Sequence, residues 1–468
     1  MSKIVLVNPP LSLEERYGVF STAGNTMPSL GLCHLAAVVK RANFEVIIIE
    51  ASSLNLSYDE TLSQILAVSP EYVGLTATTC SIHNAGKLAR MIKDKKKGIK
   101  IIIGGPHVTA IPEETMKRFP AFDIGVLGEG EETIKEILAS NGDLSGIKGL
   151  IVPTEAGFHL AGKRDFIKNL DELPFPAWEL LKDFPSIYRP AAFRFKRLPA
   201  VSLVTSRGCP NQCIFCDRAV FGNKCRAFSA EYILELIKDL QARFGIKEIL
   251  FEDDTLTMFK KRLISICENI LEENIDLSWT CLGRVDMVDL AMLKLMKKAG
   301  CWQISYGIES GSQRILDFIH KKISLDQVLN AVELSKKAGI MTKGFFILGH
   351  PTETKESIQT TIDFAKKIRI DDISVSLLTP FPGSELYEIA GKFGRFEDDW
   401  SKMNLLQSVF IPDGFTAEEI EGYYKKILKE FYLRPSIIFS YLCRMKQNPA
   451  TAWRIGKAGM SLLKRIRR

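Results

Sequence analysis

Three cysteines lie close together near the middle of the chain, and their spacing points to metal chemistry. Cys209, Cys213 and Cys216 fall within eight residues, in the run TSRGCPNQCIFCD. Thiolates at this spacing in a turn can converge on one metal centre, and an iron–sulfur cubane held by cysteine alone normally takes four of them. Three thiolates leave one iron with an open position. The triplet therefore predicts a cluster that chelates a small molecule and passes it an electron.

Two structural alternatives compete with a redox-active cluster. The gaps of three and then two residues differ from the paired Cys-x-x-Cys knuckles of most zinc sites. Cys225, nine residues after Cys216, could still complete a zinc site or a closed cluster. The N-terminus shows no signal peptide, so we expect a reducing cytoplasmic setting in which the ten cysteines form no disulfides. The cysteines outside the triplet are expected to be small core residues.

The elements that must position the triplet are six short apolar runs, each followed by helical periodicity. This alternation predicts a parallel sheet curved into a partial barrel, in which the working residues lie at the carboxyl ends of the strands. The expected strands are Val201–Thr205, Glu248–Glu252, Leu277–Leu282, Gln303–Ile308, Thr342–Leu348 and Ile373–Leu378.

Polar residues follow several of these strands, and each has a structural alternative. Asp254 and Glu309 could be helix N-terminal residues favoured by the helix dipole. Arg284 could simply pair with a neighbouring carboxylate, since buried charges need partners. His350 is either a substrate contact or a solvent-facing loop residue, and His107 in the first part of the chain is equally open.

The first 150 residues show a second alternation of strand and helix. Short continuous runs of Val, Ile and Leu are typical of strands buried on both faces, which predicts a doubly wound parallel sheet. The expected strands are Lys3–Asn8, Phe44–Ala51, Tyr72–Thr78, Lys100–Gly105 and Phe122–Gly128.

Small and polar residues gather where these strands end, at the edge where such sheets bind ligands. They are Thr78, Gly104, Gly105, Gly128 and Glu129. They do not form the Gly-x-Gly-x-x-Gly fingerprint of dinucleotide-binding proteins. The glycines could alternatively be required by turn geometry alone.

The cysteine run and its setting resemble the radical S-adenosylmethionine (SAM) superfamily. Its signature is Cys-x3-Cys-x-aromatic-Cys after the first strand of a partial barrel, and here Phe215 is the aromatic residue before Cys216. The resemblance implies a 4Fe–4S cluster whose open iron binds SAM, with reductive cleavage to a 5′-deoxyadenosyl radical. It also nominates Asp254 for the SAM amino group, Glu309 for the ribose or methionine part, and Gly349 for the backbone along adenine. The sequence departs from the family at the second strand, where Phe251-Glu252-Asp253-Asp254 replaces a Gly-Gly-Glu run.

The N-terminal sheet resembles the cobalamin-binding domain that precedes the radical SAM domain in one subfamily. The five strand-end residues named above and the run Pro28-Ser29-Leu30-Gly31-Leu32 carry this resemblance. Many cobalamin proteins use Asp-x-His-x-x-Gly to ligate cobalt, and this chain lacks that motif. His83 comes near it but is interpreted as an ordinary helix residue. The subfamily generally holds cobalamin without a protein histidine.

The domain boundaries follow changes in composition. Residues 1–150 are predicted to form the cobalamin-binding-like domain, 151–197 a Pro- and aromatic-rich ordered linker, 198–390 the barrel, and 391–468 a helical extension. From Arg434 to Arg468 there are nine Lys or Arg and no Asp or Glu, whereas the whole chain carries +7. The body is therefore close to neutral, and no nucleic-acid partner is expected. The basic tail is either a helix on anionic lipid at the inner face of a membrane or a solvated helix packed on the barrel.

Taken with these resemblances, the sequence predicts a cobalamin-dependent radical SAM methyltransferase acting at an unactivated carbon, with no catalytic side chain assigned. A cyclase or oxidase of a ring or lipid substrate is the second hypothesis. A cobalamin sensor or iron–sulfur carrier is a hypothesis from another class. The enzyme hypotheses imply a small-molecule or lipid substrate and an electron donor such as flavodoxin or ferredoxin.

Overall fold

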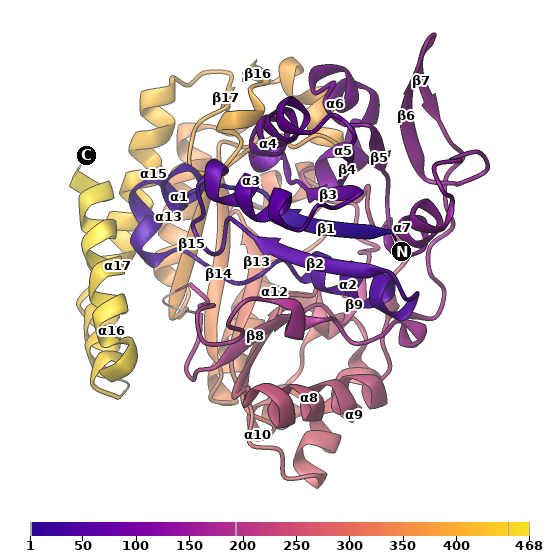
Figure 1. Ribbon diagram of the computed structural model, residues 1–468. Helices are drawn as coiled ribbons and strands as arrows, with labels where there is room; N and C mark the ends of the chain where they lie inside the picture. The colour runs from indigo at the N-terminus through magenta and orange to yellow at the C-terminus, as the bar shows by residue number, and fades with distance from the viewer. Residues whose placement is uncertain (1, 192–193, 448, 468) are drawn as a thin grey trace.

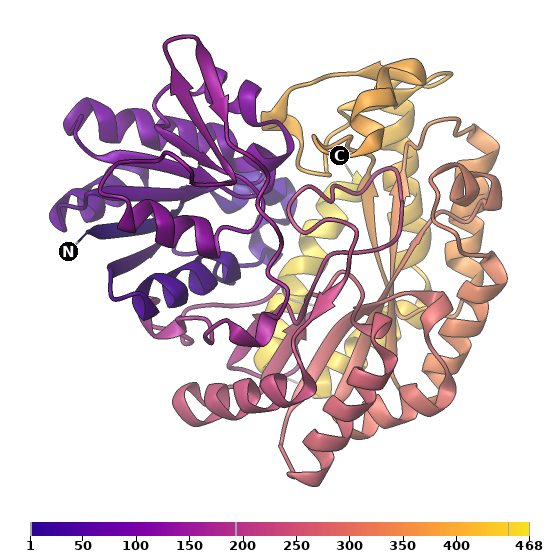
Figure 2. The ribbon, with the colours of Figure 1, turned by 90° about the vertical axis from the view of Figure 1, so that its right-hand side faces the viewer.

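Two parallel β-sheets form the framework of the protein, one in each half of the chain (Figures 1 and 2). The computed structural model describes residues 2–191, 194–447 and 449–467. The first sheet has the strand order β2-β1-β3-β4-β5-β6-β7. Its strands are β1 (Lys3–Asn8), β2 (Glu45–Glu50), β3 (Tyr72–Thr76), β4 (Lys100–Gly104), β5 (Ile124–Val126), β6 (Leu150–Thr154) and β7 (Gly157–Leu160).

The predicted doubly wound parallel sheet is confirmed for β1 to β5, which all pair in parallel. Strands β6 and β7 add an antiparallel hairpin, so the sheet continues ten residues into the segment expected to be a linker. The order β2-β1-β3 reverses direction beside β1, and ligands bind such sheets at this switch point.

Helices cover both faces of the first sheet, because its strands present apolar side chains to each face. In β1, Ile4 and Leu6 share a core with α2 and α7, whereas Val5 and Val7 share a core with α3 and α4. The helical segments of this half are α1 (Leu13–Tyr17), η1 (Gly18–Ala23), α2 (Leu30–Arg41), α3 (Tyr58–Ala67), α4 (Ile82–Lys95), α5 (Pro106–Ala110), α6 (Pro112–Arg118) and α7 (Glu131–Ala139).

The second sheet is the predicted partial barrel of six parallel strands, paired in consecutive order. Its strands are β8 (Ala200–Leu203), β11 (Glu248–Phe251), β12 (Ser278–Gly283), β13 (Cys301–Glu309), β14 (Met341–Leu348) and β15 (Asp372–Leu377). The helices of this half are α8 (Ala230–Phe244), α9 (Lys260–Glu272), α10 (Leu290–Lys298), α11 (Gln313–Phe318), α12 (Leu325–Lys337), α13 (Lys355–Lys367) and α14 (Glu385–Ile389). Figure 2 shows helices along the outer side of this sheet.

The segment between the sheets packs against both of them. The Ala177 amide donates to the Cys33 carbonyl on α2 at 3.0 Å. The Tyr232 hydroxyl on α8 donates to the Leu173 carbonyl at 3.2 Å. Trp178 of the same segment is fully buried between the two halves. Its apolar side chains therefore join the two halves into one continuous core.

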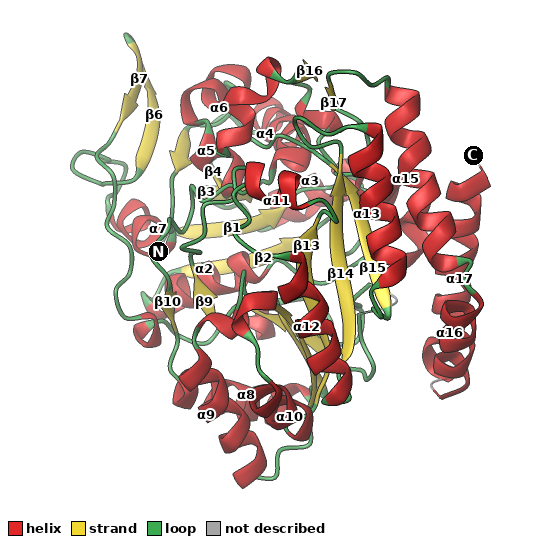
Figure 3. Cartoon of the chain, turned by 180° about the vertical axis from the view of Figure 1, so that it is seen from behind, coloured by secondary structure: helices red, strands yellow, loops and turns green. Residues whose placement is uncertain are grey.

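The C-terminal part begins with a small antiparallel hairpin, β16 (Gly394–Phe396) and β17 (Phe410–Pro412), before the expected helices. These helices are α15 (Ala417–Tyr432), α16 (Pro435–Gln447) and α17 (Pro449–Arg467), which lie together along one edge of the molecule (Figure 3). Between the hairpin strands, Trp400 is completely buried in the core under α4. Within the described ranges no helix has the length and apolar character needed to cross a bilayer.

Candidate functional site

The three cysteines lie on a loop that leaves the carboxyl end of β8 and is closed at its base by a two-stranded ribbon. Strand β9 (Ser206–Arg207) enters the loop and β10 (Arg226–Ala227) leaves it, paired antiparallel. Gly208 begins the loop with φ of +87°, and a Cβ there would lie 2.5 Å from the Lys224 carbonyl oxygen. A residue with a side chain would therefore force the loop open.

The cysteine side chains match the predicted cluster in number, and Cys213 and Cys216 interact with each other. A hydrogen bond from the Cys216 thiol lowers the pKa of Cys213 and raises that of Cys216. The Cys209 sulfur accepts from the side-chain Nδ2 of Asn211 at 3.3 Å. Cys225, the alternative fourth ligand, donates to the Gly208 carbonyl at 2.7 Å and so has a partner outside the triplet. The described residues contain no group of three His, Cys, Asp or Glu side chains placed to hold a single metal ion.

A buried ion pair lies beside this loop and was not expected from the sequence. The Lys321 ammonium is 2.6 Å from a carboxylate oxygen of Glu309, and both side chains are about nine-tenths buried. Lys321 also lies 5.9 Å from the centre of the Phe215 ring. Lys321 and Arg284 both lower the pKa of Cys213 electrostatically, which favours its thiolate. The structure therefore gathers Glu309, Phe215 and two cations around the cysteines.

Glu309 is itself in an unusual backbone conformation, with φ of +67°. This is the left-handed region that residues with a side chain rarely adopt, and such conformations cluster at functional sites. Arg284 forms a two-point ion pair with Asp286, with its Nε 3.0 Å from a carboxylate oxygen. The structural alternative for Arg284 therefore holds, although the residue still lies near the cysteines.

The end of β14 places Gly349 and His350 beside a buried carboxylate. The Gly349 and His350 amides both donate to one oxygen of Glu353, at 2.7 and 2.9 Å. Burial raises the pKa of Glu353 to about 7. His350 is completely buried against Phe215, and burial lowers its pKa to about 4. His350 is thus not the solvent-facing residue that one hypothesis expected.

Asp253 and Asp254 follow β11 and have different surroundings. One oxygen of Asp253 accepts from the Thr205 amide and hydroxyl and from the Ser206 hydroxyl, at 2.5 to 3.0 Å. Asp253 is completely buried and therefore anchors the strand that enters the cysteine loop. Asp254 lines a cavity, and the desolvation of its carboxyl group by the surrounding protein raises the pKa of that group.

That interdomain cavity has a volume of about 520 Å³ and separates the two sheets at their carboxyl ends. Five of its residues are the strand-end candidates of the first sheet, one lies on the cysteine loop, and one follows β11. These seven are Thr78, Gly104, Gly105, Gly128, Glu129, Cys209 and Asp254. The fold therefore brings the predicted cobalamin edge and part of the predicted SAM site to one space.

Two of the glycines leave room that a side chain would fill. A Cβ on Gly104 would meet only the Val126 carbonyl oxygen, at 4.0 Å, and one on Gly128 only the Val220 oxygen, at 3.8 Å. Gly105 differs, because its φ is +106° and a Cβ would lie 2.7 Å from the Ala77 oxygen. Backbone geometry thus accounts for Gly105 and also favours glycine at position 128, where φ is +73°, whereas Gly104 is explained by the space it leaves open for a ligand.

His34 on α2 is a further cavity residue that sequence reasoning missed. Its side chain is about nine-tenths buried, and its Nδ1 has no hydrogen-bond partner in the structure. Burial lowers its pKa to about 3, so the ring is neutral at physiological pH. A buried polar atom without a partner, on a residue that lines a cavity, fits a site completed by a bound molecule. The cavity continues past His34 to Gly74 in the middle of β3. Space, open glycines and this orphan nitrogen together fit a large cofactor such as cobalamin.

Glu129 is engaged in a buried interdomain ion network, even though it lines the cavity. Its two carboxylate oxygens lie 2.7 Å from Arg207 and 2.9 Å from Arg226. Glu131 lies 2.5 Å from Arg207, and all four side chains are largely buried. The Ile167 amide also donates to Glu129. The network therefore ties the loop after β5 to the ribbon that carries the cysteines.

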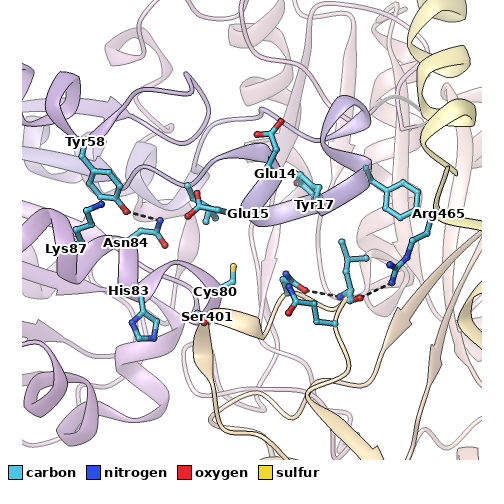
Figure 4. Close-up of a pocket in the computed structure, with 16 residues that line it drawn as sticks. Glu14, Glu15, Tyr17, Tyr58, Cys80, His83, Asn84, Lys87, Ser401 and Arg465 are labelled. Atoms are coloured by element: carbon cyan, nitrogen blue, oxygen red, sulfur yellow. Dashed lines mark hydrogen bonds between the residues drawn. The ribbon is translucent and has the colours of Figure 1, made fainter. Parts of the chain in front are cut away.

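The two remaining candidate histidines lie away from this cavity. His107 accepts or donates at 3.2 Å to the Thr79 hydroxyl and packs edge-on against Trp400 at 4.3 Å between ring centres. His83 on α4 lines a second pocket of about 610 Å³ (Figure 4). This pocket lies between the N-terminal helices, the segment 401–407 and α17, and includes Arg465. Burial lowers the pKa of both histidines.

Comparison with known proteins gives two family matches. Residues 203–365 match the radical SAM superfamily, and residues 17–138 match the B12 binding domain. An uncharacterized methyltransferase of Pyrococcus horikoshii is 37% identical over 441 residues, which cover 93% of this chain and 94% of that protein. The anaerobic magnesium-protoporphyrin IX monomethyl ester cyclase of Rubrivivax gelatinosus is 27% identical over 427 residues, covering 89% of this chain and 75% of that protein.

Two solved structures share the fold. The radical SAM methyltransferase TsrM of Kitasatospora setae, with cobalamin and a 4Fe–4S cluster bound, gives a TM-score of 0.71 at 17% identity, over 93% of this chain and 90% of that chain. The cobalamin-dependent SAM radical enzyme OxsB gives 0.67 at 21% identity, over 83% of this chain and 55% of that chain. This chain thus spans little more than half of OxsB. The protein belongs to the radical SAM superfamily and carries an N-terminal B12-binding domain, and it is an enzyme whose cofactors are a 4Fe–4S cluster, SAM and cobalamin.

Proposed function

We propose that the protein is a cobalamin-dependent methyltransferase that acts on an unactivated carbon of its substrate. The observation that carries this proposal is the interdomain cavity, whose walls include Gly104 and Gly128 on one side and Cys209 and Asp254 on the other. A methyl group held on the first domain and a radical generated on the second would meet in this space. The methyltransferase relative at 37% identity supports the same conclusion.

The residues of the chain position these groups. Asp253 fixes the strand that leads into the cysteine loop, and the network of Glu129, Arg207 and Glu131 holds that loop against the first domain. When bound, the cluster and SAM supply a primary carbon radical and cobalamin supplies a methyl group. The apolar side chains that line the cavity, among them Leu6 and Ile102, keep bulk water from this space.

A cyclase is the second candidate, because a relative with 27% identity bears that name. The same cofactors would serve it, so the two candidates differ in the products formed from SAM. A methyltransferase consumes SAM in two ways and releases both 5′-deoxyadenosine and S-adenosylhomocysteine. A cyclase that transfers no methyl group releases 5′-deoxyadenosine without S-adenosylhomocysteine.

The test uses anoxically reconstituted protein incubated with SAM, cobalamin and dithionite. We expect both products from the wild type, none from Cys213→Ala, and wild-type yields from Cys225→Ala, whose thiol lies outside the triplet. Absence of 5′-deoxyadenosine from protein with a full iron content would contradict radical chemistry. Formation of 5′-deoxyadenosine alone would favour the cyclase.

We also propose the partners that this chemistry needs. Each reductive cleavage consumes one electron, so a small electron-transfer protein such as flavodoxin or ferredoxin would serve as donor. The substrate is proposed to be a small molecule or a lipid that enters the interdomain cavity.

A further inference from the structure

The two C-terminal helices carry an unusual share of the exposed apolar surface. Seven of the eleven exposed large hydrophobic side chains in the described residues lie between Leu433 and Leu463. Phe439 is 69% exposed and Trp453 is 67% exposed. Exposed apolar residues are ordinarily scattered singly, and a concentration of them marks an interaction surface.

These side chains fall on the outer side of a helical hairpin. On α16 they are Ile438, Phe439 and Leu442, and on α17 they are Trp453, Met460 and Leu463. The spacings of four on α16 and of seven and three on α17 place the members of each set on one helix face. We call these six residues the apolar tail face. The side chains of Ile455, Ile466 and Arg467, and all of Arg468, lie outside the described residues.

The inner side of the same hairpin is fastened to the body of the protein. The Ser461 hydroxyl is 3.0 Å from the Thr22 hydroxyl of η1. The Tyr441 hydroxyl donates to Asp372 at the start of β15, at 2.9 Å. Arg465 donates to the Leu406 carbonyl at 3.4 Å, beside the pocket of Figure 4. The hairpin is therefore a docked element at the edge of the molecule, as Figure 1 also shows. The side chains of the apolar tail face are exposed to solvent.

The charged residues of α16 and α17 are all basic. Lys446 on α16 and Lys457 and Lys464 on α17 flank it, and no Asp or Glu follows Glu430 in the sequence. The Lys457 ammonium lies 3.8 Å from the centre of the Trp453 ring. An apolar face with an exposed tryptophan and a basic border matches the boundary between acyl chains and anionic headgroups.

A second copy of the chain is a poorer occupant of this face. A symmetric dimer brings the same patch of both copies together. Residues 434–468 include nine Lys or Arg and no Asp or Glu, so these segments of the two copies would then repel one another. An anionic lipid surface satisfies both the apolar residues and the charges.

We propose that the apolar tail face docks the enzyme on the surface of a membrane rich in anionic phospholipid. Phe439, Leu442, Trp453 and Met460 enter the acyl boundary, and the three lysines contact headgroup phosphates. The attachment is peripheral and reversible, and it orients the enzyme with α16 and α17 toward the bilayer.

The protein offers a built-in probe for this docking. It has five tryptophans, of which Trp178, Trp279, Trp302 and Trp400 are buried and Trp453 is exposed. Acrylamide quenching of tryptophan fluorescence in the holoenzyme therefore reports mainly on Trp453. Vesicles of phosphatidylcholine with phosphatidylglycerol should shift the emission to shorter wavelength and protect it from acrylamide, whereas phosphatidylcholine vesicles should have much less effect.

Sedimentation with the same vesicles measures affinity and uses matched variants. Phe439→Ser with Trp453→Ser should abolish cosedimentation. Leu160 on β7 is 50% exposed and lies outside the apolar tail face, so Leu160→Ser should leave cosedimentation unchanged. Replacing Lys446, Lys457 and Lys464 by Gln should weaken binding about fivefold for each lysine, and raised salt should weaken it further.

Three results would overturn the proposal. One is equal recovery of protein in the pellet with and without anionic vesicles, together with unchanged quenching. Another is equal binding to neutral and anionic vesicles, which would exclude the role of the lysines. The third is a protein that is dimeric by light scattering and becomes monomeric with Phe439→Ser and Trp453→Ser, because a second copy would then cover this face.

Discussion

Removal of Arg207 tests the interdomain ion network most directly. In the wild type, Arg207 pairs with Glu129 and Glu131, and the side chains of all three are no more than 6% exposed. In Arg207→Met, Glu129 keeps Arg226, which lies 2.9 Å away, but Glu131 loses its cation. The variant therefore leaves one uncompensated carboxylate in the interface between the domains.

The magnitude follows from what remains around Glu131. Breaking a buried ion pair by removing one partner costs about 3–5 kcal/mol, because the other charge stays buried. Glu131 is the first residue of α7, where the helix dipole favours a negative charge and offsets part of this cost. We therefore expect a loss near the lower limit, about 3 kcal/mol. An exposed pair such as Lys337 and Glu333, 3.7 Å apart, should contribute about 0–1 kcal/mol, so Lys337→Met serves as the control.

The assay is urea unfolding followed by circular dichroism, with attention to the first transition, since a protein of two domains can unfold in more than one step. Arg207→Met should shift that transition strongly and Lys337→Met hardly at all. Adding Glu131→Gln to Arg207→Met removes the stranded charge and should recover part of the loss. Equal shifts for Arg207→Met and Lys337→Met, or a double variant less stable than Arg207→Met, would refute the reasoning.

Three further outcomes are expected. Gly104→Val should lower the cobalamin bound after reconstitution, measured by absorbance, because the side chain enters the cavity, whereas Gly98→Val in an open loop should not. Burial lowers the pKa of His107 to about 3, so the unfolded chain binds the extra proton below about pH 6.5. His107 therefore costs the folded state nothing above that pH, and the free energy of unfolding falls by about 1.4 kcal/mol per pH unit on acidification toward pH 3. The urea midpoints at pH 7 and pH 5 should therefore differ less in His107→Phe than in the wild type. Lys321→Met should destabilise the barrel by about 3 kcal/mol, because Glu309 is left buried without its cation, and urea unfolding that matches wild type would exclude this.

Much of the framework was predictable because its signals are local. Continuous runs of Val, Ile and Leu predicted the parallel strands. Their alternation with helices predicted a doubly wound sheet in the first part of the chain and a partial barrel in the second. The hairpin of β6 and β7 was missed, because its residues beyond Leu150 and Ile151 are mostly exposed and show no apolar pattern. The small hairpin of β16 and β17 was missed in the same way, since strands of three residues leave no periodicity.

The sequence by itself predicted the chemistry of the cluster, because three cysteines within eight residues form a local motif that is recognisable without the fold. Only the tertiary structure decided which charges pair around it. Arg207 and Glu129 are 78 positions apart, and nothing in their sequence neighbourhoods indicates that they meet. His34 looked like one polar residue in an apolar helix until the fold set it beside a cavity. Side-chain partners across a domain interface depend on how whole elements pack, and that packing has no local signature.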